Sequence, residues 1–344
     1  MASRGPIRSS RATKTTERAG LRIIFTALLA WLMLFTGAAF AQSGYPARQI
    51  TLIVPFAAGG PTDMVAHLVQ DSMSHTLGQQ IVIENVIGAG GTTAAIRTMR
   101  AAPDGYTIML GHMGTHAAAV ALYPKLPYNP STDFAPIGLV LRMPMLIVAR
   151  KTFPAHDLKE FIDYATQHAA ELTMAHAGMG SVSYVTCELF NAVLGLSPKL
   201  AAYQGSGPAM TALVAGKVDY MCDQVVAVVP QYRSTAIRVF AIASTGRNAS
   251  LPDVPTADEA GLAGFDVSAW NALFAPRATP GPVVERLNAA LEVALDDPSV
   301  RKVLLGLGSE IPEPAERSPE ALAALVKSEI AKWMPLMTRT EAAH

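Results

Sequence analysis

Hydrophobic residues along the chain recur with two periods, one typical of β-strands and the other of α-helices. Residues 50–54 form a short apolar run rich in β-branched side chains, which Pro55 ends. From Asp63 to Leu77 the apolar residues recur with helical spacing, and Gly78 stands where a helix C-terminal glycine is expected. Because this strand–loop–helix order repeats, the pattern predicts parallel strands joined by right-handed crossovers.

The same pattern predicts elements along the rest of the chain. Strands are expected at residues 50–54, 81–86, 107–110, 146–149, 172–175, 218–221, 238–243 and 269–274. Helices are expected at residues 63–77, 92–101, 157–168, 183–194, 209–215, 282–295, 298–307 and 319–336. The series restarts near residue 146 without a strict sequence repeat. We therefore expect an α/β fold, a two-lobed clamp in which each lobe is a mostly parallel sheet flanked by helices.

The length of the chain also favours two lobes, because 344 residues exceed the size at which a single hydrophobic core usually stops growing. We expect residues 42–144 together with 266–344 to form lobe 1, and residues 145–265 to form lobe 2. The chain would then cross twice between the lobes, and such a pair of crossings forms a hinge.

The first 41 residues have the pattern of a secretory signal peptide. Six basic residues precede or begin an apolar run from Leu21 to about Phe40, and Ala39-Phe40-Ala41 fits a cleavage site with small residues. A retained membrane anchor is the alternative, since the apolar run is near the lower limit for crossing a bilayer. The small residues at its end favour cleavage, which predicts a secreted, periplasmic chain that starts at Gln42.

Loss of this segment changes the charge of the protein. The whole chain has 27 basic and 27 acidic residues, and removal of residues 1–41 leaves 21 basic and 26 acidic ones, a formal charge of −5. A mildly acidic protein lacks the basic surface that nucleic acids require, so we expect no nucleic-acid partner. An anionic ligand would have to be held by local dipoles and backbone amides.

Two glycine-rich turns, Pro55–Asp63 and His176–Ser183, each follow a predicted strand and precede a predicted helix. Glycine lets the backbone approach a ligand closely, and a helix N-terminus binds anions. Either turn alone could be only a tight turn before a capped helix, but one in each lobe favours a shared carboxylate site. The candidate ligand-binding residues in these turns are Phe56, Gly59, Gly60, Thr62, Asp63, Gly178, Gly180 and Ser181, with Thr62 or Asp63 as the expected helix cap.

The other motifs give little support to an enzyme. The turn Gly88–Thr93 has Thr93 where a dinucleotide fingerprint needs Gly or Ala, and no confirming acidic residue follows it, which excludes a dinucleotide site. Residues 204–208 approach a nucleophile elbow with the wrong spacing. We therefore expect no catalysis and no cofactor.

Several polar residues are candidates for lining a cleft. His112 and His116 are four residues apart, a spacing that can hold a metal on a helix, but Gly111 and Gly114 indicate a loop, so we expect no metal. Asp223 could hold an amine, order a loop or be solvated, and we favour loop ordering. The candidates of this group are His112, Thr115, His116, Tyr203, Ser206 and Asp223.

Cys187 and Cys222 are the two cysteines of the chain. In an oxidising compartment they could form a disulfide, whereas two buried free thiols are the alternative.

Seven motifs in combination resemble the Bug or TctC family of periplasmic solute-binding proteins. They are Ile53–Phe56 with Gly59–Asp63, Gly88–Gly91, Ala102–Thr107, Leu122–Tyr128, Gly205–Ala209, Gly216–Asp219 and Leu251–Thr256. The resemblance runs from Tyr45-Pro46 to the last predicted helix. The sequence departs from it at His176, where many relatives have Ser or Asn, and at Gln204, which replaces a usual Lys.

The resemblance implies a type II-like periplasmic-binding-protein clamp that holds a small carboxylate between the Phe56–Thr62 and Gly178–Ser181 loops, largely by backbone amides and ordered water. It implies uptake with two membrane subunits of a tripartite tricarboxylate transporter, with a sensor subunit that signals to a membrane receptor as the alternative. A subset of relatives has cysteines at both the Cys187 and Cys222 positions, which implies a disulfide. We expect a monomer.

Overall fold

The computed structural model of the protein describes residues 1–2 and 44–342. It forms two separate units, residues 1–47 and 48–344, and every helix and strand named below belongs to the second unit. The predicted signal peptide, apart from residues 1–2, lies outside the described residues and stays a prediction. Within the described part of the chain, no helix has the length and apolar character needed to cross a bilayer.

The strands of residues 48–342 form one hydrogen-bonded sheet in the order β2-β1-β3-β9-β4-β7-β5-β6, with β8 also paired to β4. Their bounds are β1 Ile50–Val54, β2 Ile81–Asn85, β3 Thr107–His112, β4 Phe134–Arg150, β5 Thr173–His176, β6 Lys199–Ala202, β7 Tyr220–Gln224, β8 Ile237–Ala243 and β9 Ser268–Pro276. Strands β2, β1 and β3 are parallel, as are β6, β5 and β7, whereas β4, β8 and β9 pair antiparallel with their neighbours. The predicted α/β class is confirmed.

The long strand β4 joins the two parallel sets. From Phe134 to Pro144 it pairs with β9, and from Met145 to Ala149 it pairs with β7 on one side and with β8 on the other. The partner change falls at residues 144 and 145. We call β1, β2, β3, β9 and β4 up to Pro144, with their helices, the first half, and the rest of the sheet with its helices the second half.

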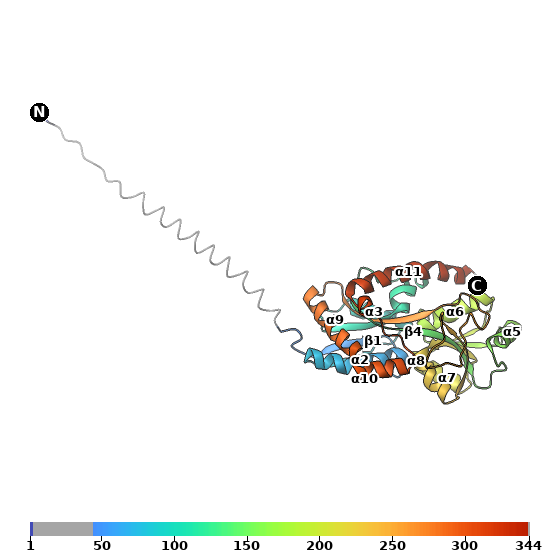
Figure 1. Cartoon of the computed structure of the whole chain (residues 1–344). Coiled ribbons are helices and arrows are strands. Elements are labelled where there is room, and N and C mark those ends of the chain that lie inside the picture. Colours follow the sequence, from blue (N-terminus) through green and yellow to red (C-terminus); the bar gives the residue numbers. More distant parts are fainter. Residues whose placement is uncertain (3–43, 343–344) are drawn as a thin grey trace. The chain divides into compact units, whose positions relative to one another are not determined.

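Helices cover the sheet in both halves (Figure 1). Those of the first half are α2 Pro61–Leu77, α3 Thr92–Met99, α4 Ala119–Leu122, α9 Gly281–Asp296, α10 Pro298–Gly306 and α11 Pro319–Ala342, together with the short segments η1 Ala89–Gly91, η2 Gly114–Ala118 and η3 Pro314–Glu316. Those of the second half are α5 Leu158–His168, α6 Val182–Leu194, α7 Ser206–Val214 and α8 Val225–Arg233. Helix α11 packs on β4 and α4 and also contacts α6, so the C-terminal helix touches both halves.

Local sequence explains the ends of α2, the helix that follows the first strand. Pro61 occupies its first turn, where the missing N–H costs nothing, and Gly78 ends it in the left-handed conformation with φ 71°. Strand β1 lies between β2 and β3 and is almost entirely buried, which explains its continuous apolar sequence.

The structure differs from the predicted elements at β4, at α8 and at the turn around His116, and it adds the short elements β6 and α4, which were not predicted. Strand β4 is far longer than the expected 146–149, because Pro136, Gly138 and Pro144 hide its first part, which contains irregular register shifts. Helix α8 was not predicted, since its Val-rich sequence with Pro230 inside it favours a strand. The expected loop around His116 is instead the π-helical turn η2.

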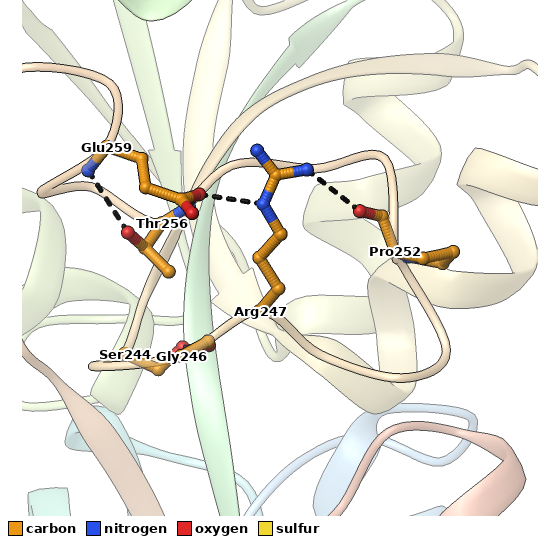
Figure 2. A network of polar contacts seen from close by, with 6 residues as sticks. All are labelled: Ser244, Gly246, Arg247, Pro252, Thr256 and Glu259. Atoms are coloured by element: carbon orange, nitrogen blue, oxygen red, sulfur yellow. Dashed lines mark hydrogen bonds and ion pairs between the residues drawn. The ribbon is translucent and has the colours of Figure 1, made fainter.

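A polar network fixes the connection after β8 (Figure 2). Arg247 donates from Nε to Glu259 Oε2 at 2.8 Å and from a terminal nitrogen to the Pro252 carbonyl at 3.0 Å. The amide of Thr256 donates to Glu259, and the amide of Glu259 donates to the Thr256 hydroxyl. The Leu251–Thr256 motif is therefore part of the network that holds the connection between β8 and β9 in place.

Cys187 of α6 and Cys222 of β7 are joined by a disulfide with a Cα–Cα distance of 5.4 Å. Both residues are fully buried. The bond ties the helix that follows β5 to the strand beside β5.

Candidate ligand-binding site

A narrow cavity of about 10 Å³, roughly the room that one water molecule needs, lies between the two halves, at the carboxyl ends of parallel strands. Its lining comes from the segments that follow β1, β5 and β6 and from the last residue of β7, as expected for a ligand site in an α/β protein. The ten lining residues are Phe56, Gly60, Pro61, Thr62, Ala177, Ser181, Val182, Ser183, Ser206 and Gln224.

Four helices, α2, α6, α7 and α8, begin at the wall of this cavity. Gly60, Ser181, Gly205 and Gln224 are the N-caps of α2, α6, α7 and α8, and each of these helices has its N-cap or first-turn residues in the lining. The first N–H groups of a helix have no acceptor within it, and each helix places roughly half a positive charge at this end. Four such ends supply donors and a positive potential from both halves, although no Lys or Arg lines the cavity.

The first loop is held in shape by Asp63. One carboxylate oxygen accepts from the amide of Gly59 at 2.9 Å, and the other accepts from Asn85 at 2.8 Å. Asn85 also donates to the carbonyl of Phe56 at 2.9 Å. Asp63 therefore orders the loop that presents Phe56, and it does not line the cavity. The predicted side-chain cap by Thr62 or Asp63 is wrong, because the N-cap is Gly60 and has no side chain.

The second loop is built by two serines. Ser181 caps α6 by accepting from the amide of Tyr184, and its hydroxyl lies 3.1 Å from that of Ser183. The Ser183 hydroxyl accepts from the amide of Ala177 at 2.9 Å. These bonds position the first turn of α6, which faces the cavity.

Glycines allow the two halves to touch beside the cavity. A Cβ on Gly90, in the first half, would overlap the carbonyl of Met179, and one on Gly114 would overlap the carbonyl of Gly180. A Cβ on Gly180 would lie 2.9 Å from the ring of Tyr123. These residues therefore define a close contact between the halves.

A second contact between the halves lies around the first loop. A Cβ on Gly207 would lie 3.2 Å from the carbonyl oxygen of Gly59. The amide of Ala57 donates to the carbonyl of Gln204 at 3.1 Å. The exposed Gln204, which replaces a usual Lys of the family, meets the first half through its backbone, and its side chain does not line the cavity.

His112, Thr115 and His116 do not reach the cavity but lie fully buried in the first half. His112 stacks on Phe56 with ring centroids 5.1 Å apart, and its Nδ1 accepts from the amide of Gly114 at 2.9 Å. Burial lowers the pKa of His112 to about 3 and, with the neighbouring His112 as a second cause, lowers the pKa of His116 well below its ordinary value. Both rings are therefore neutral.

The described residues contain no group of three or more His, Cys, Asp or Glu side chains that could hold a metal. His116 is stacked on Phe274 with ring centroids 3.8 Å apart, and its Nδ1 lies 2.9 Å from the Thr115 hydroxyl. Packing accounts for the position of this ring.

Asp223 and Gln224 end β7 at the wall of the cavity. Asp223 is fully buried in the strand itself, which corrects the expected loop position, and its Oδ1 accepts from the amide of Gln224 at 2.9 Å. Burial raises the pKa of Asp223 to about 7, against the opposing effects of the Gln224 amide and the Ser206 hydroxyl.

The structure thus brings together Phe56, Gly60, Thr62, Ser181 and Ser206 of the predicted residues, and Gly59, Gly178 and Gly180 lie beside them at contacts between the halves. Tyr203 is half-buried, and its amide donates to the carbonyl of His176 at 2.8 Å outside the lining. The sequence reasoning missed Pro61, Ala177, Val182, Ser183 and Gln224. The signal that could have found Gln224 was its place three residues after the predicted strand 218–221, which was expected to be parallel to the strand before Ala177.

Comparison with known proteins shows the family. The sequence model of the protein family described as 'Tripartite tricarboxylate transporter family receptor' matches residues 65–341 of this chain. A relative from Agrobacterium vitis, the UPF0065 protein in the TAR-I ttuE-ttuC' intergenic region, is 41% identical over 325 residues, or 94% of this chain and 92% of the relative. The chain belongs to the tripartite tricarboxylate transporter receptor family.

Solved structures agree with the fold of this receptor. MatC (Rpa3494) from Rhodopseudomonas palustris with bound malate is 53% identical, covers 85% of this chain and 100% of its own, and has a TM-score of 0.84. The periplasmic binding protein BugD is 41% identical, covers 86% of this chain and 99% of its own, and also has a TM-score of 0.84. The predicted resemblance and the clamp fold are therefore confirmed.

Proposed function

We propose that this receptor captures a small dicarboxylate between its two halves and delivers it for uptake across the cytoplasmic membrane. The observation that carries the proposal is the convergence of four helix N-termini, those of α2, α6, α7 and α8, on one cavity. Four ends of about half a positive charge each would balance a dianion. The malate bound to MatC is an acid of this class.

The two halves would act as the lobes of a clamp, residues 42–144 with 266–344 and residues 145–265. The change of partner along β4 at residues 144 and 145 supports this division. The contacts of Gly59 with Gly207 and of Gly90 with Met179 would form on closure around the ligand.

The proposed receptor binds its ligand without chemical change. None of the ten lining residues is His, Lys, Cys, Asp or Glu, so the cavity wall offers no general acid or base beside the Ser hydroxyls. We further propose that residues 1–41 direct the chain to the periplasm, where it acts as a monomer with the two membrane subunits of a transporter.

Thermal unfolding of the mature protein, stripped of carried-over ligand, tests the function. A ligand that binds only the folded state at one hundred times its Kd adds about 2.7 kcal/mol to the free energy of unfolding. We expect a rise in Tm with C4 dicarboxylates and none with amino sugars or cationic amino acids. A protein that responds to no mono-, di- or tricarboxylate contradicts the proposal.

A further inference from the structure

The lining of the cavity contains one polar atom that the capture of an anion does not explain. Among the described residues, Gln224 Oε1 is the buried side-chain oxygen that both lacks a hydrogen-bond partner and belongs to a lining residue. The side chain is only 5% exposed, so water does not freely replace the missing donor. A buried acceptor without a donor is costly, which makes a donor on the ligand the natural partner.

We propose that Gln224 reads a hydroxyl group next to a carboxylate of the ligand, so that the receptor selects hydroxy-dicarboxylates over the same acids without the hydroxyl. This inference rests on the proposed function. It adds the residue that would determine specificity and the chemical feature that it recognises.

Two of the three lining serines of the second half already accept a hydrogen bond from a backbone amide, and the third, Ser206, is bonded to the carboxyl of Asp223. Ser181 accepts from the amide of Tyr184, and Ser183 accepts from the amide of Ala177. The helix ends around them offer donors, which suit carboxylate oxygens. A ligand hydroxyl would therefore find its acceptor at Gln224, while its carboxylates take the N–H groups.

The backbone holds Gln224 in place for this role. Its amide donates to Asp223 Oδ1 at 2.9 Å, and its Cα lies opposite Met145 in the register of β7 with β4. Two residues earlier, the disulfide of Cys222 ties β7 to α6, whose first turn forms another part of the wall. The acceptor is thus fixed relative to the N–H groups that would hold the carboxylate.

An ammonium group could also donate to Gln224, but the surroundings favour a neutral donor. Four helix N-termini make the potential positive, which opposes a cation. The nearby carboxyl of Asp223 is fully buried, and burial raises its pKa to about 7, so below that pH it is mostly neutral and supplies little fixed negative charge.

Calorimetric titration with malate, succinate and aspartate tests the inference, because these acids share two carboxylates and a four-carbon chain. We expect wild-type protein to bind at least one enantiomer of malate about 10- to 100-fold more tightly than succinate. Gln224→Met, which keeps the length and removes the acceptor, should reduce that ratio to about threefold or less, with the Kd for succinate nearly unchanged. Gln231→Met, on the same helix outside the cavity lining, should keep the wild-type ratio.

Each other outcome has a distinct meaning. If Gln224→Met weakens malate and succinate equally, the amide contacts a carboxylate and the inference is wrong. Equal wild-type affinity for malate and succinate also overturns it while leaving the proposed function intact. Tighter binding of aspartate than of malate would show that Gln224 accepts from an ammonium group instead of a hydroxyl, which contradicts the inference. Absence of binding by any carboxylate contradicts the proposed function itself.

Discussion

The hydroxyl of Tyr123 donates a 2.6 Å hydrogen bond to the carbonyl oxygen of Met179, and this bond joins the two halves of the receptor. Tyr123 follows α4 in the first half, whereas Met179 lies in the loop before α6. The two residues meet beside Gly180, where a side chain would strike the tyrosine ring. The bond therefore exists only while the halves touch.

Tyr123→Phe should weaken ligand binding because it removes a bond present only in the closed arrangement. One hydrogen bond contributes about 0.5–1.5 kcal/mol, so we expect the Kd to rise about 2- to 12-fold. Tyr128→Phe is the matched control, since Tyr128 donates at 2.7 Å to the Thr115 carbonyl within the first half. The control should lower stability without a comparable change in Kd. Equal effects of both variants in calorimetry would contradict a role in closure.

Gly90→Ala should prevent the halves from closing. A Cβ at this position would overlap the backbone carbonyl of Met179, which no change of rotamer relieves, so we expect the Kd to rise more than about tenfold. Gly195→Ala is the matched control, because Gly195 also has a left-handed backbone, with φ 67°, but has open space around it. Both variants should lose about 1–2 kcal/mol of stability from backbone strain, and only Gly90→Ala should lose affinity. Wild-type affinity in Gly90→Ala contradicts the closure contact.

Much of the fold could be predicted because local signals agreed with the tertiary structure. Gly78 correctly places the end of α2, and only its first two residues were missed, because Thr62 or Asp63 was expected as the cap and Pro61 was not taken as the helix start. The first part of β4 could not be predicted, since Pro136 and Pro144 are tolerated there by register shifts and by pairing that only the folded sheet supplies. Helix α8 likewise depends on its packing against β4 and β7.

The candidate site was predictable where glycine and helix-start signals coincide, as at Gly60 and Ser181. His112 and His116 appeared to be cleft residues because their sequence neighbours Gly111 and Gly114 indicate a loop. In the structure these glycines make room for packing, since a Cβ on Gly111 would strike the His116 ring and one on Gly114 the Gly180 carbonyl. Gln224 carries no local motif, and only the meeting of distant strand ends places it in the lining.

Asp223 should make stability depend on pH. Its pKa of about 7 in the folded protein is raised by burial from 3.8, so the folded state keeps a proton that the unfolded state releases. The stabilisation is fully present below pH 4 and is lost as the pH rises through 7. Asp223→Asn, which stays neutral, should therefore gain about 1–3 kcal/mol relative to wild type between pH 4 and pH 8. Urea unfolding of the ligand-free protein at both pH values measures the difference.

Asp219→Asn is the contrasting control for Asp223. Asp219 accepts from Arg150 at 2.9 Å and from the amide of Thr173 at 2.8 Å, so its charge is compensated. Its replacement should lower stability at pH 8, the opposite sign to that expected for Asp223→Asn. A pH dependence in Asp223→Asn identical to that of wild type would show that this carboxyl is not the group responsible.

The disulfide of Cys187 and Cys222 should stabilise the fold and hold the cavity wall together. It closes a separation of 35 residues, for which a loss of about 2–4 kcal/mol in the free energy of unfolding is expected on removal. Cys187→Ala with Cys222→Ala should show this loss, and should also bind ligand less tightly because α6 and β7 supply facing parts of the lining. Urea unfolding with and without a reductant provides the control: reductant should destabilise the wild type alone. If reductant also destabilises the double variant, the disulfide is not the source of the reductant-sensitive stability.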